Sequence, residues 1–336
     1  MNTSTNHEHE IMGLLEIRNL KKYFPLGTGF FGKSRGAVKA VDGVNLTVEE
    51  GETLGLVGES GCGKSTLGRS ILRLIEPTEG ELLFQGENIL GLSQRALREM
   101  RKQMQIVFQD PYASLNPRMR VGDIVGEGLG IHKLAKGKLK KVRVIELLHQ
   151  VGLTGEHYDR YPHEFSGGQR QRVGIARALA VDPKFIVADE PVSSLDVSIQ
   201  AQIINLLQEL QEKRHLTYFF ISHDLRVVEH ISHRVAIMYL GKIVEIARRE
   251  TIYQDAKHPY TRALLSAVPI PDPSRGRERD ILQGDVPSPV HPPSGCSFHP
   301  RCPYREELCD KVTPQLEFLA NGHGVACHVF GPGKRV

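Results

Sequence analysis

One short stretch of the chain has the residue types and spacing of a phosphate-binding loop. GESGCGKST matches G-x-x-x-x-G-K-[ST], with an apolar segment before it and a helical pattern after it. Glycines let backbone N–H groups turn inward around a phosphate, and a helix start adds favourable partial charge. We expect Lys64 to reach the β- and γ-phosphates and the Ser65 hydroxyl to ligate Mg²⁺. The predicted nucleotide-binding residues here are Gly58, Glu59, Ser60, Gly61, Cys62, Gly63, Lys64, Ser65 and Thr66, with no role for the Cys62 thiol.

A second stretch, FIVADE, supplies the other half of a nucleotide site. Four apolar residues are followed by Asp189 and Glu190. We expect Asp189 to hold Mg²⁺ through water and Glu190 to polarise an attacking water molecule. An apolar strand that ends in Asp-Glu is weak evidence alone, but it becomes strong evidence downstream of a phosphate loop.

The segment FSGGQRQRVGIARALAVDP predicts another helix that begins at a phosphate. Ser166 can cap this helix, Gly167 and Gly168 allow close backbone approach, and the helix should end before Asp182. One γ-phosphate does not need two helix starts from one chain. We therefore expect the residues from Ser166 to Gln169 to close over a nucleotide held by a partner subunit.

Four of the five cysteines gather near the end of the chain with the spacing C-x5-C-x6-C-x17-C. The segment is too rich in proline and too short to build its own core, so a metal would supply the folding energy. We predict a [4Fe–4S] cluster in preference to Zn²⁺, since no tight C-x2–4-C pair occurs. His299 and His328 are possible replacements for a cysteine ligand. The alternative to a metal site is a set of free structural thiols. The segment lies far in sequence from Lys64, which suggests a structural or regulatory role. The predicted cluster ligands are Cys296, Cys302, Cys309 and Cys327.

Alternating strand and helix patterns must position these groups. From about residue 14 to 255, short apolar strands alternate with helices, which predicts an α/β core. Two early strands suggest an antiparallel portion, and residues 110–165 suggest a helical insertion. PKFIVADEP and LTYFFISHD have the pattern of buried parallel strands that present polar groups at their carboxyl ends. After residue 256 the chain becomes rich in proline.

Composition narrows the class of protein further. The 336 residues are 40% hydrophobic and 24% charged, with a net charge of +4, values typical of a globular protein. The basic run 133–143 has no interleaved aromatic residues, which argues against nucleic-acid binding. No apolar run approaches the ~18 residues that span a bilayer, and the N-terminus is unlike a secretory signal. We expect a cytosolic protein with reduced thiols, which disfavours disulfides.

With these motifs in order, residues 14–255 resemble the ATP-binding cassette (ABC) ATPases. SGGQR after Phe165 is similar to the family signature, although leucine is commoner in the place of Phe165. By the same resemblance, Gln109 matches the Q-loop, which contacts Mg²⁺ and water and couples to a membrane subunit. Further matches are Asp196 of SSLD to the D-loop, His223 to the switch histidine, and Phe24 to the adenine-stacking aromatic residue, with Tyr23 as the alternative.

The resemblance implies a fold and a reaction. The expected fold is a P-loop NTPase core with an antiparallel β-subdomain and a helical subdomain at about 110–178, plus a small Cys/Pro-rich extension at 256–336. The expected reaction is in-line attack of water on ATP within a dimer, with Glu190 as the base. No nucleotide-site motif is missing, so we expect an active ATPase.

The region after residue 250 resembles the C-terminal extension of the second ATPase subunit of bacterial dipeptide and oligopeptide importers. KHPYTRALLSAVP, GDVPSP and PPSGCSFHPRCP carry this likeness. It implies two permeases, a solute-binding protein, a paralogous ATPase partner in a heterodimer, and a peripheral place on the cytoplasmic face of the membrane. A homodimer stays open, as does the cargo, since relatives also serve nickel, haem, glutathione and murein peptides. The alternative class is a soluble ABC ATPase of DNA repair or translation, but neither long heptad insertions nor two cassettes occur.

Overall fold

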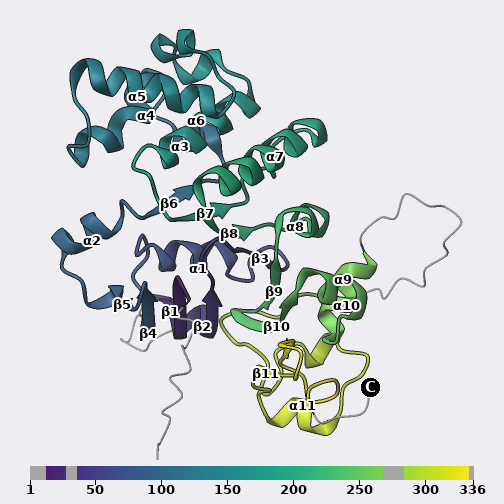
Figure 1. The fold of residues 1–336 in the computed structure, drawn as a ribbon. Helices are drawn as coiled ribbons and strands as arrows, with labels where there is room; N and C mark the ends of the chain where they lie inside the picture. The colour runs from purple at the N-terminus through teal and green to yellow at the C-terminus, as the bar shows by residue number, and fades with distance from the viewer. Residues whose placement is uncertain (1–12, 28–35, 268–283, 333–336) are drawn as a thin grey trace, which may run out of the picture.

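The computed structural model describes residues 13–27, 36–267 and 284–332. Two sheets, a group of helices and a C-terminal extension make up this part of the chain (Figure 1). The proline-rich part of the chain that the sequence predicts after residue 256 lies partly outside the described residues, and so does the N-terminal insert PLGTGFFGKSRGAVKAV, which also resembles the peptide-importer subunits.

The elements have the following bounds. The strands are β1 (Leu15–Pro25), β2 (Ala37–Val48), β3 (Thr53–Val57), β4 (Glu79–Phe84), β5 (Glu87–Asn88), β6 (Met104–Val107), β7 (Phe185–Asp189), β8 (Thr217–Ile221), β9 (Arg234–Tyr239), β10 (Lys242–Arg248), β11 (Glu317–Phe318) and β12 (Gly324–Val325). The α-helices are α1 (Lys64–Ile71), α2 (Gln94–Met100), α3 (Pro111–Ser114), α4 (Val121–Ile131), α5 (Gly137–Gln150), α6 (Gly167–Leu179), α7 (Val197–Arg214), α8 (Leu225–Ile231), α9 (Arg249–Asp255), α10 (Pro259–Ser266) and α11 (Glu307–Lys311). Short 3₁₀ turns are η1 (Ile89–Gly91), η2 (Gly155–Asp159), η3 (Pro162–Glu164) and η4 (His299–Arg301).

The central sheet has the order β11-β12-β10-β9-β3-β8-β7-β6. Its strands from β9 to β6 are parallel, as the α/β pattern predicted. All residues of β3, β7 and β8 are buried, because helices cover both faces of a parallel sheet. The carboxyl ends of β3, β7 and β8 therefore meet at one edge, where the polar motif residues follow them.

A smaller antiparallel sheet of order β2-β1-β4-β5 covers one side of α1. Strand β1 alternates buried and open positions, and its buried side chains Leu15, Ile17 and Leu20 join one hydrophobic core with Leu67 and Ile71 of α1. This packing holds the start of α1, and with it the phosphate loop, between the two sheets. Figure 1 shows the antiparallel sheet in purple to blue below α1.

Helices α3 to α6 form a separate group beyond the β6 edge of the central sheet (Figure 1). They span residues 111–179, which agrees with the helical insertion expected from the sequence. Val125, Leu148 and Val173 from α4, α5 and α6 are fully buried between these helices. Within the described parts of the chain, no helix is both long and apolar enough to cross a bilayer.

The C-terminal extension joins the central sheet. Strand β12 pairs antiparallel with β10, so that Val325 lies opposite Glu245. The fully buried Glu245 carboxylate accepts hydrogen bonds from the backbone N–H groups of Lys257 and His258, and it lies 2.7 Å from His323 Nε2. One side chain thus ties the start of α10 and the turn before β12 to the core. The extension is docked, and its backbone continues the sheet.

Candidate functional site

The phosphate loop lies between β3 and α1, as its pattern predicted. Gly63 has φ of 110°, and a Cβ there would lie 1.9 Å from the carbonyl oxygen of Ala40, so only glycine fits. At Gly58 a Cβ would lie 2.2 Å from the carbonyl oxygen of Met238. Both glycines therefore let the loop pack tightly on neighbouring backbone. This packing leaves the N–H groups at the start of α1 open for an anion.

Lys64 is buried at the first position of α1. Its ammonium group donates hydrogen bonds to the carbonyl oxygens of Gly58, at 2.7 Å, and Glu59, at 3.0 Å. The side chain thus folds back along the loop, which keeps its charge beside the place where phosphates would lie. Burial raises the pKa of the Cys62 thiol, whose sulfur lies 3.9 Å from the Lys64 ammonium, so the thiol stays neutral.

Ser65 and Asp189 bring the two halves of the predicted metal site together. The Ser65 hydroxyl donates a 2.7 Å hydrogen bond to Asp189 Oδ1, across 124 sequence positions. Asp189 is 1% exposed, and its Oδ2 atom has no hydrogen-bond partner; the nearest cation is Arg69, at 3.6 Å. Burial raises the pKa of Asp189. A buried carboxylate oxygen without a partner, beside a hydroxyl, fits the oxygen ligands that Mg²⁺ prefers.

Glu190 lies at the edge of the site with two predicted residues around it. Gln109 Nε2 donates to Glu190 Oε2 at 2.9 Å, and His223 Nδ1 lies 3.1 Å from the same oxygen. These residues follow β6, β7 and β8, whose carboxyl ends share one edge of the sheet. Glu190 has φ of 47°, a left-handed conformation that is unusual for a residue with a side chain. Strain of this kind collects at functional sites.

A cavity of about 600 Å³ lies over these groups. Phe24 lines it and is 38% exposed, whereas the Tyr23 hydroxyl donates to the Asp42 carboxylate outside the cavity. Of the two aromatic residues left open by the sequence, Phe24 is therefore the one at the cavity. The lining residues are Phe24, Val38, Ala40, Ser60, Gly61, Gly63, Lys64, Ser65, Thr66, Gln109, Glu190, His223 and Pro289.

The signature residues do not line this cavity. Ser166 caps α6: its hydroxyl accepts from the Gln169 N–H at 3.3 Å, and the Gln169 side chain accepts from the Ser166 N–H at 3.0 Å. Gly168 packs on α7, where a Cβ would lie 2.5 Å from Ile199. Asp196 occupies the N-cap position of α7 without a side-chain cap hydrogen bond, and it is exposed. Ser166, Gly167, Gly168, Gln169 and Asp196 are all absent from the lining of the chain's own cavity, and their role at a second nucleotide stays a prediction.

The predicted [4Fe–4S] cluster is wrong, and so is its Zn²⁺ alternative. Among the described residues, which include all four cysteines of the tail, no group of three or more His, Cys, Asp or Glu side chains could hold a metal ion. His299 and His328 instead contact backbone oxygens of Cys296 and Val312. The cysteines are free thiols, and burial raises the pKa of Cys296 to about 12, so it keeps its proton.

The physical reason is that the extension does not have to form a core alone. Phe298 is 1% exposed, and its ring centroid lies 5.3 Å from that of Tyr239 in β9 and 5.5 Å from that of Tyr260 in α10. Cys296 and Cys302 pack against the same core. Apolar burial against β9 and α10 thus supplies the stabilisation that the sequence assigned to a metal.

The sequence also missed three residues that approach the site from the C-terminal part of the chain. Pro289 lines the cavity, and its carbonyl oxygen accepts from the Lys39 N–H at 3.1 Å. Tyr260 and Arg301 both hydrogen-bond to Glu59 of the phosphate loop. Nothing in their local sequence signals these contacts, because each partner lies about 200 or more positions away.

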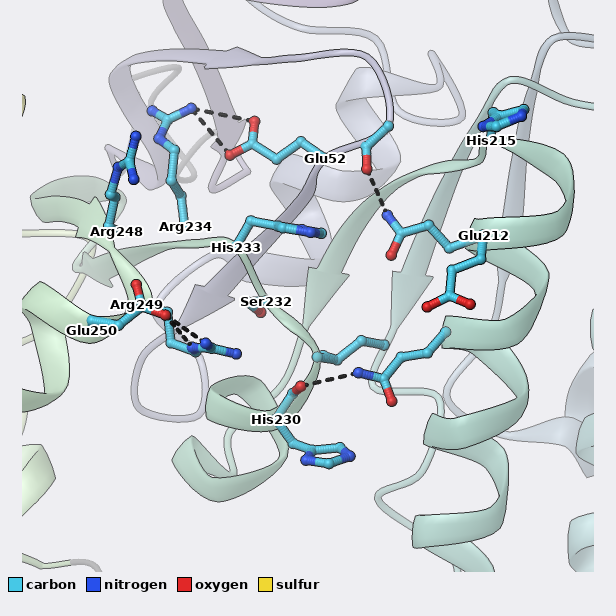
Figure 2. A pocket seen from close by; sticks show the side chains of 14 residues that line it. Glu52, Glu212, His215, His230, Ser232, His233, Arg234, Arg248, Arg249 and Glu250 are labelled. Carbon is cyan, nitrogen blue, oxygen red and sulfur yellow. Dashed lines mark hydrogen bonds and ion pairs between the residues drawn. The ribbon is translucent and has the colours of Figure 1, made fainter.

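A second cavity, of about 670 Å³, lies at the opposite end of the parallel strands (Figure 2). Its charged side chains largely neutralise one another: Arg234 pairs with Glu52 at 3.3 Å, and Arg249 pairs with Glu250. None of the predicted site residues lines it. The predicted site residues that line one of these two cavities therefore all line the first one.

The chain is similar to known transport proteins. The ABC transporter family model matches residues 41–193, and the model of the oligopeptide/dipeptide transporter C-terminal region matches residues 244–309. The oligopeptide transport ATP-binding protein AppF of Bacillus subtilis (strain 168) is 54% identical over 321 residues, which cover 94% of this chain and 97% of that protein. A putative peptide import ATP-binding protein of Brucella ovis is 53% identical over 315 residues, with coverage of 94% and 97%.

Solved structures show the same fold. The dimeric structure of the ATP-binding cassette MJ0796 in a post-hydrolysis state, bound to ADP and Pi, has a TM-score of 0.62 and 30% sequence identity. It covers 70% of this chain and 98% of its own. Part of the cbiONQ transporter complex, cbiO1 from Clostridium perfringens, has a TM-score of 0.61 and 26% identity, with coverage of 72% and 91%.

Proposed function

This chain belongs to the ABC transporter ATPases that carry an oligopeptide/dipeptide transporter C-terminal region, and from that premise we propose that it is the ATP-hydrolysing subunit of a peptide importer. The observation that best supports hydrolysis is that Gln109 and His223 meet on one oxygen of Glu190, beside Ser65 and Asp189. Dipeptides and oligopeptides are the proposed cargo because the relatives that match almost the whole chain are named as peptide transport and import proteins.

The proposed chemistry divides among the residues around the cavity. The Glu190 carboxylate takes a proton from water, the water oxygen bonds to the γ-phosphorus, and the bond to the β-γ bridging oxygen breaks to release ADP and phosphate. Gln109 and His223 hold the Glu190 carboxylate in place through contacts of 2.9 and 3.1 Å. The Lys64 ammonium neutralises phosphate charge. Bound Mg²⁺ would add positive charge at the phosphate oxygens, held by Ser65 and Asp189 with Gln109 nearby.

The active unit is proposed to be a dimer. The capped start of α6 and Asp196 lie outside the chain's own cavity, so they are free to complete a site on another subunit. The partner is proposed to be a paralogous ATPase, and the dimer is proposed to bind two permeases at the cytoplasmic face of the membrane and to serve an extracytoplasmic solute-binding protein. We also propose a division of the chain into an ATPase domain at 14–255, with its helical subdomain at about 110–178, and an extension at 256–336.

Reconstitution tests this function. The chain should be a weak ATPase alone, and its activity should rise when its permeases, its partner ATPase and a peptide-loaded binding protein are present in proteoliposomes. Uptake of labelled peptide should require both ATP and the binding protein. Stimulation by DNA or ribosomes, with none by the loaded binding protein, would assign the chain to DNA repair or translation instead.

A further inference from the structure

Glu59, the second residue of the phosphate loop, makes contacts through all its polar groups, and none of them faces the cavity. Its carboxylate accepts two hydrogen bonds from Arg301, at 2.8 and 3.1 Å. Its N–H donates to the Tyr260 hydroxyl oxygen at 2.8 Å, and its carbonyl oxygen accepts from Lys64 at 3.0 Å. Glu59 is absent from the residues that line the cavity. Side chains of the C-terminal part of the chain therefore hold the phosphate loop through Glu59, a residue that does not line the cavity.

Arg301 is well fixed for this contact. It ends the 3₁₀ turn η4, its side chain is 7% exposed, and it also lies 3.5 Å from the Tyr239 hydroxyl. Phe298, three residues before it, is buried between Tyr239 and Tyr260. A planar guanidinium paired with both oxygens of a carboxylate is geometrically specific as well as strong. Rotation of Arg301 would thus shift Glu59 and with it the loop.

The Glu59–Arg301 pair is also linked to the Lys64 ammonium. Glu59 and Gly58 carry the two carbonyl oxygens that Lys64 contacts. A displaced Glu59 would therefore move the lysine as well as the loop backbone. The extension reaches the site at a second point through Pro289, which lines the cavity beside β2.

We propose that Arg301 and Tyr260 are positioning residues for the phosphate loop, so that the docked extension sets the affinity of the site for the phosphates of ATP. This inference rests on the proposed nucleotide site. Because the two are linked, ATP binding must in turn strengthen the docking of the extension. A purely structural tether would hold the extension to the core without altering nucleotide affinity.

Titration of the full-length chain with ATP and Mg²⁺ tests the proposal. Removal of one partner from a largely buried ion pair leaves the other charge uncompensated. We expect Arg301→Ala to weaken ATP binding by about tenfold, and Tyr260→Phe, which removes the hydroxyl that accepts from the Glu59 N–H, by about threefold, each on the order of a broken hydrogen bond. In the assembled ATPase the KM for ATP should rise in the same proportion, while kcat falls less than twofold. Arg301→Lys should recover part of the affinity, since lysine keeps the charge but cannot form the paired contact.

A double-mutant cycle separates positioning from general damage. Glu59→Gln should weaken ATP binding about as much as Arg301→Ala, and the double variant should be no weaker than either single variant, because both remove one contact. Arg305→Ala is the matched control, since it breaks a 2.8 Å pair with Asp310 in the same extension, and neither of these two residues lines the cavity. It should leave ATP affinity unchanged.

Some results would overturn the proposal. If Arg301→Ala and Glu59→Gln lower the melting temperature but leave ATP affinity at the wild-type value, the pair is only a tether. Additive losses in the double variant would also reject it. Should Arg301→Ala fail to fold, Tyr260→Phe, which keeps the ring that packs on Phe298, decides the question. Wild-type ATP binding is measured in the same series. No ATP binding by the wild-type chain would contradict the proposed nucleotide site, whereas wild-type ATP affinity in the variants would contradict only the positioning role.

Discussion

Gln109 donates a 2.9 Å hydrogen bond to Glu190 across 81 sequence positions. Gln109 follows β6 at the base of the helical group, and Glu190 follows β7 in the central sheet. The bond therefore joins the part of the chain that is proposed to sense the membrane subunit to the proposed catalytic base. A movement of Gln109 away from the central sheet would break this bond, and the proposed membrane subunits could control hydrolysis in that way.

Glu190→Gln should keep ATP binding but lower hydrolysis by about two orders of magnitude or more, because the amide cannot accept a proton from water. The measurement is single-turnover hydrolysis in the assembled transporter. Glu209→Gln, which alters an exposed carboxylate of α7, is the control and should hydrolyse ATP normally. Normal turnover in the Glu190 variant would show that another group is the base.

Asp189→Asn should abolish Mg²⁺-dependent hydrolysis and yet stabilise the nucleotide-free chain. Burial raises the pKa of Asp189 above its ordinary 3.8, so its charged form destabilises the fold at neutral pH. The gain in melting temperature should be full above the raised pKa and should shrink as the pH falls through it toward 3.8, since wild-type Asp189 is then protonated. Thermal unfolding at several pH values measures this. A variant less stable than wild type at neutral pH would contradict the argument.

Ser166→Ala should impair the dimer more than the fold. Loss of an N-cap serine costs about 1 kcal/mol of stability. Ser93→Ala is a matched control, because Ser93 caps α2 through a hydrogen bond of the same 3.3 Å length, to the Ala96 N–H. Both variants should lose similar stability, but only Ser166→Ala should lower ATPase activity of the assembled dimer, by about tenfold for one lost phosphate contact. Equal ATPase activity in the two variants would reject a role in the partner's site.

Phe24→Ala should weaken ATP binding by about tenfold, within the range that aromatic stacking on a base contributes. Phe24→Tyr should bind almost normally, since the ring is kept. Tyr23→Phe removes only the hydrogen bond to Asp42 and serves as the control. If Tyr23→Phe and Phe24→Ala have equal effects on nucleotide affinity, the Phe24 ring does not stack on the adenine base.

The local parts of the site were predictable from sequence. The phosphate loop depends on a few consecutive backbone conformations, such as φ of 110° at Gly63, which specify glycine directly. Strands β7 and β8 are continuous apolar runs because both faces are covered, and the cap of α6 needs only Ser166 and Gln169. The helical insertion and the parallel sheet followed from the same short-range patterns. These features depend on neighbours in the chain, so the sequence displays them.

Contacts between distant segments were decided only by the tertiary structure. Arg301 pairs with Glu59 across 242 positions, and no local sequence pattern indicates this contact. Which of Phe24 and Tyr23 lies at the cavity depends on which ring strand β1 directs toward it. The metal prediction failed for the same reason. The number and spacing of the cysteines show which metal ligands are available. They do not show whether the segment can be stabilised without a metal, by burial of Phe298 against Tyr239 and Tyr260. Long-range contacts form when the packing free energy of the whole chain exceeds the entropy of closing the intervening loop, and no short stretch of sequence contains that sum.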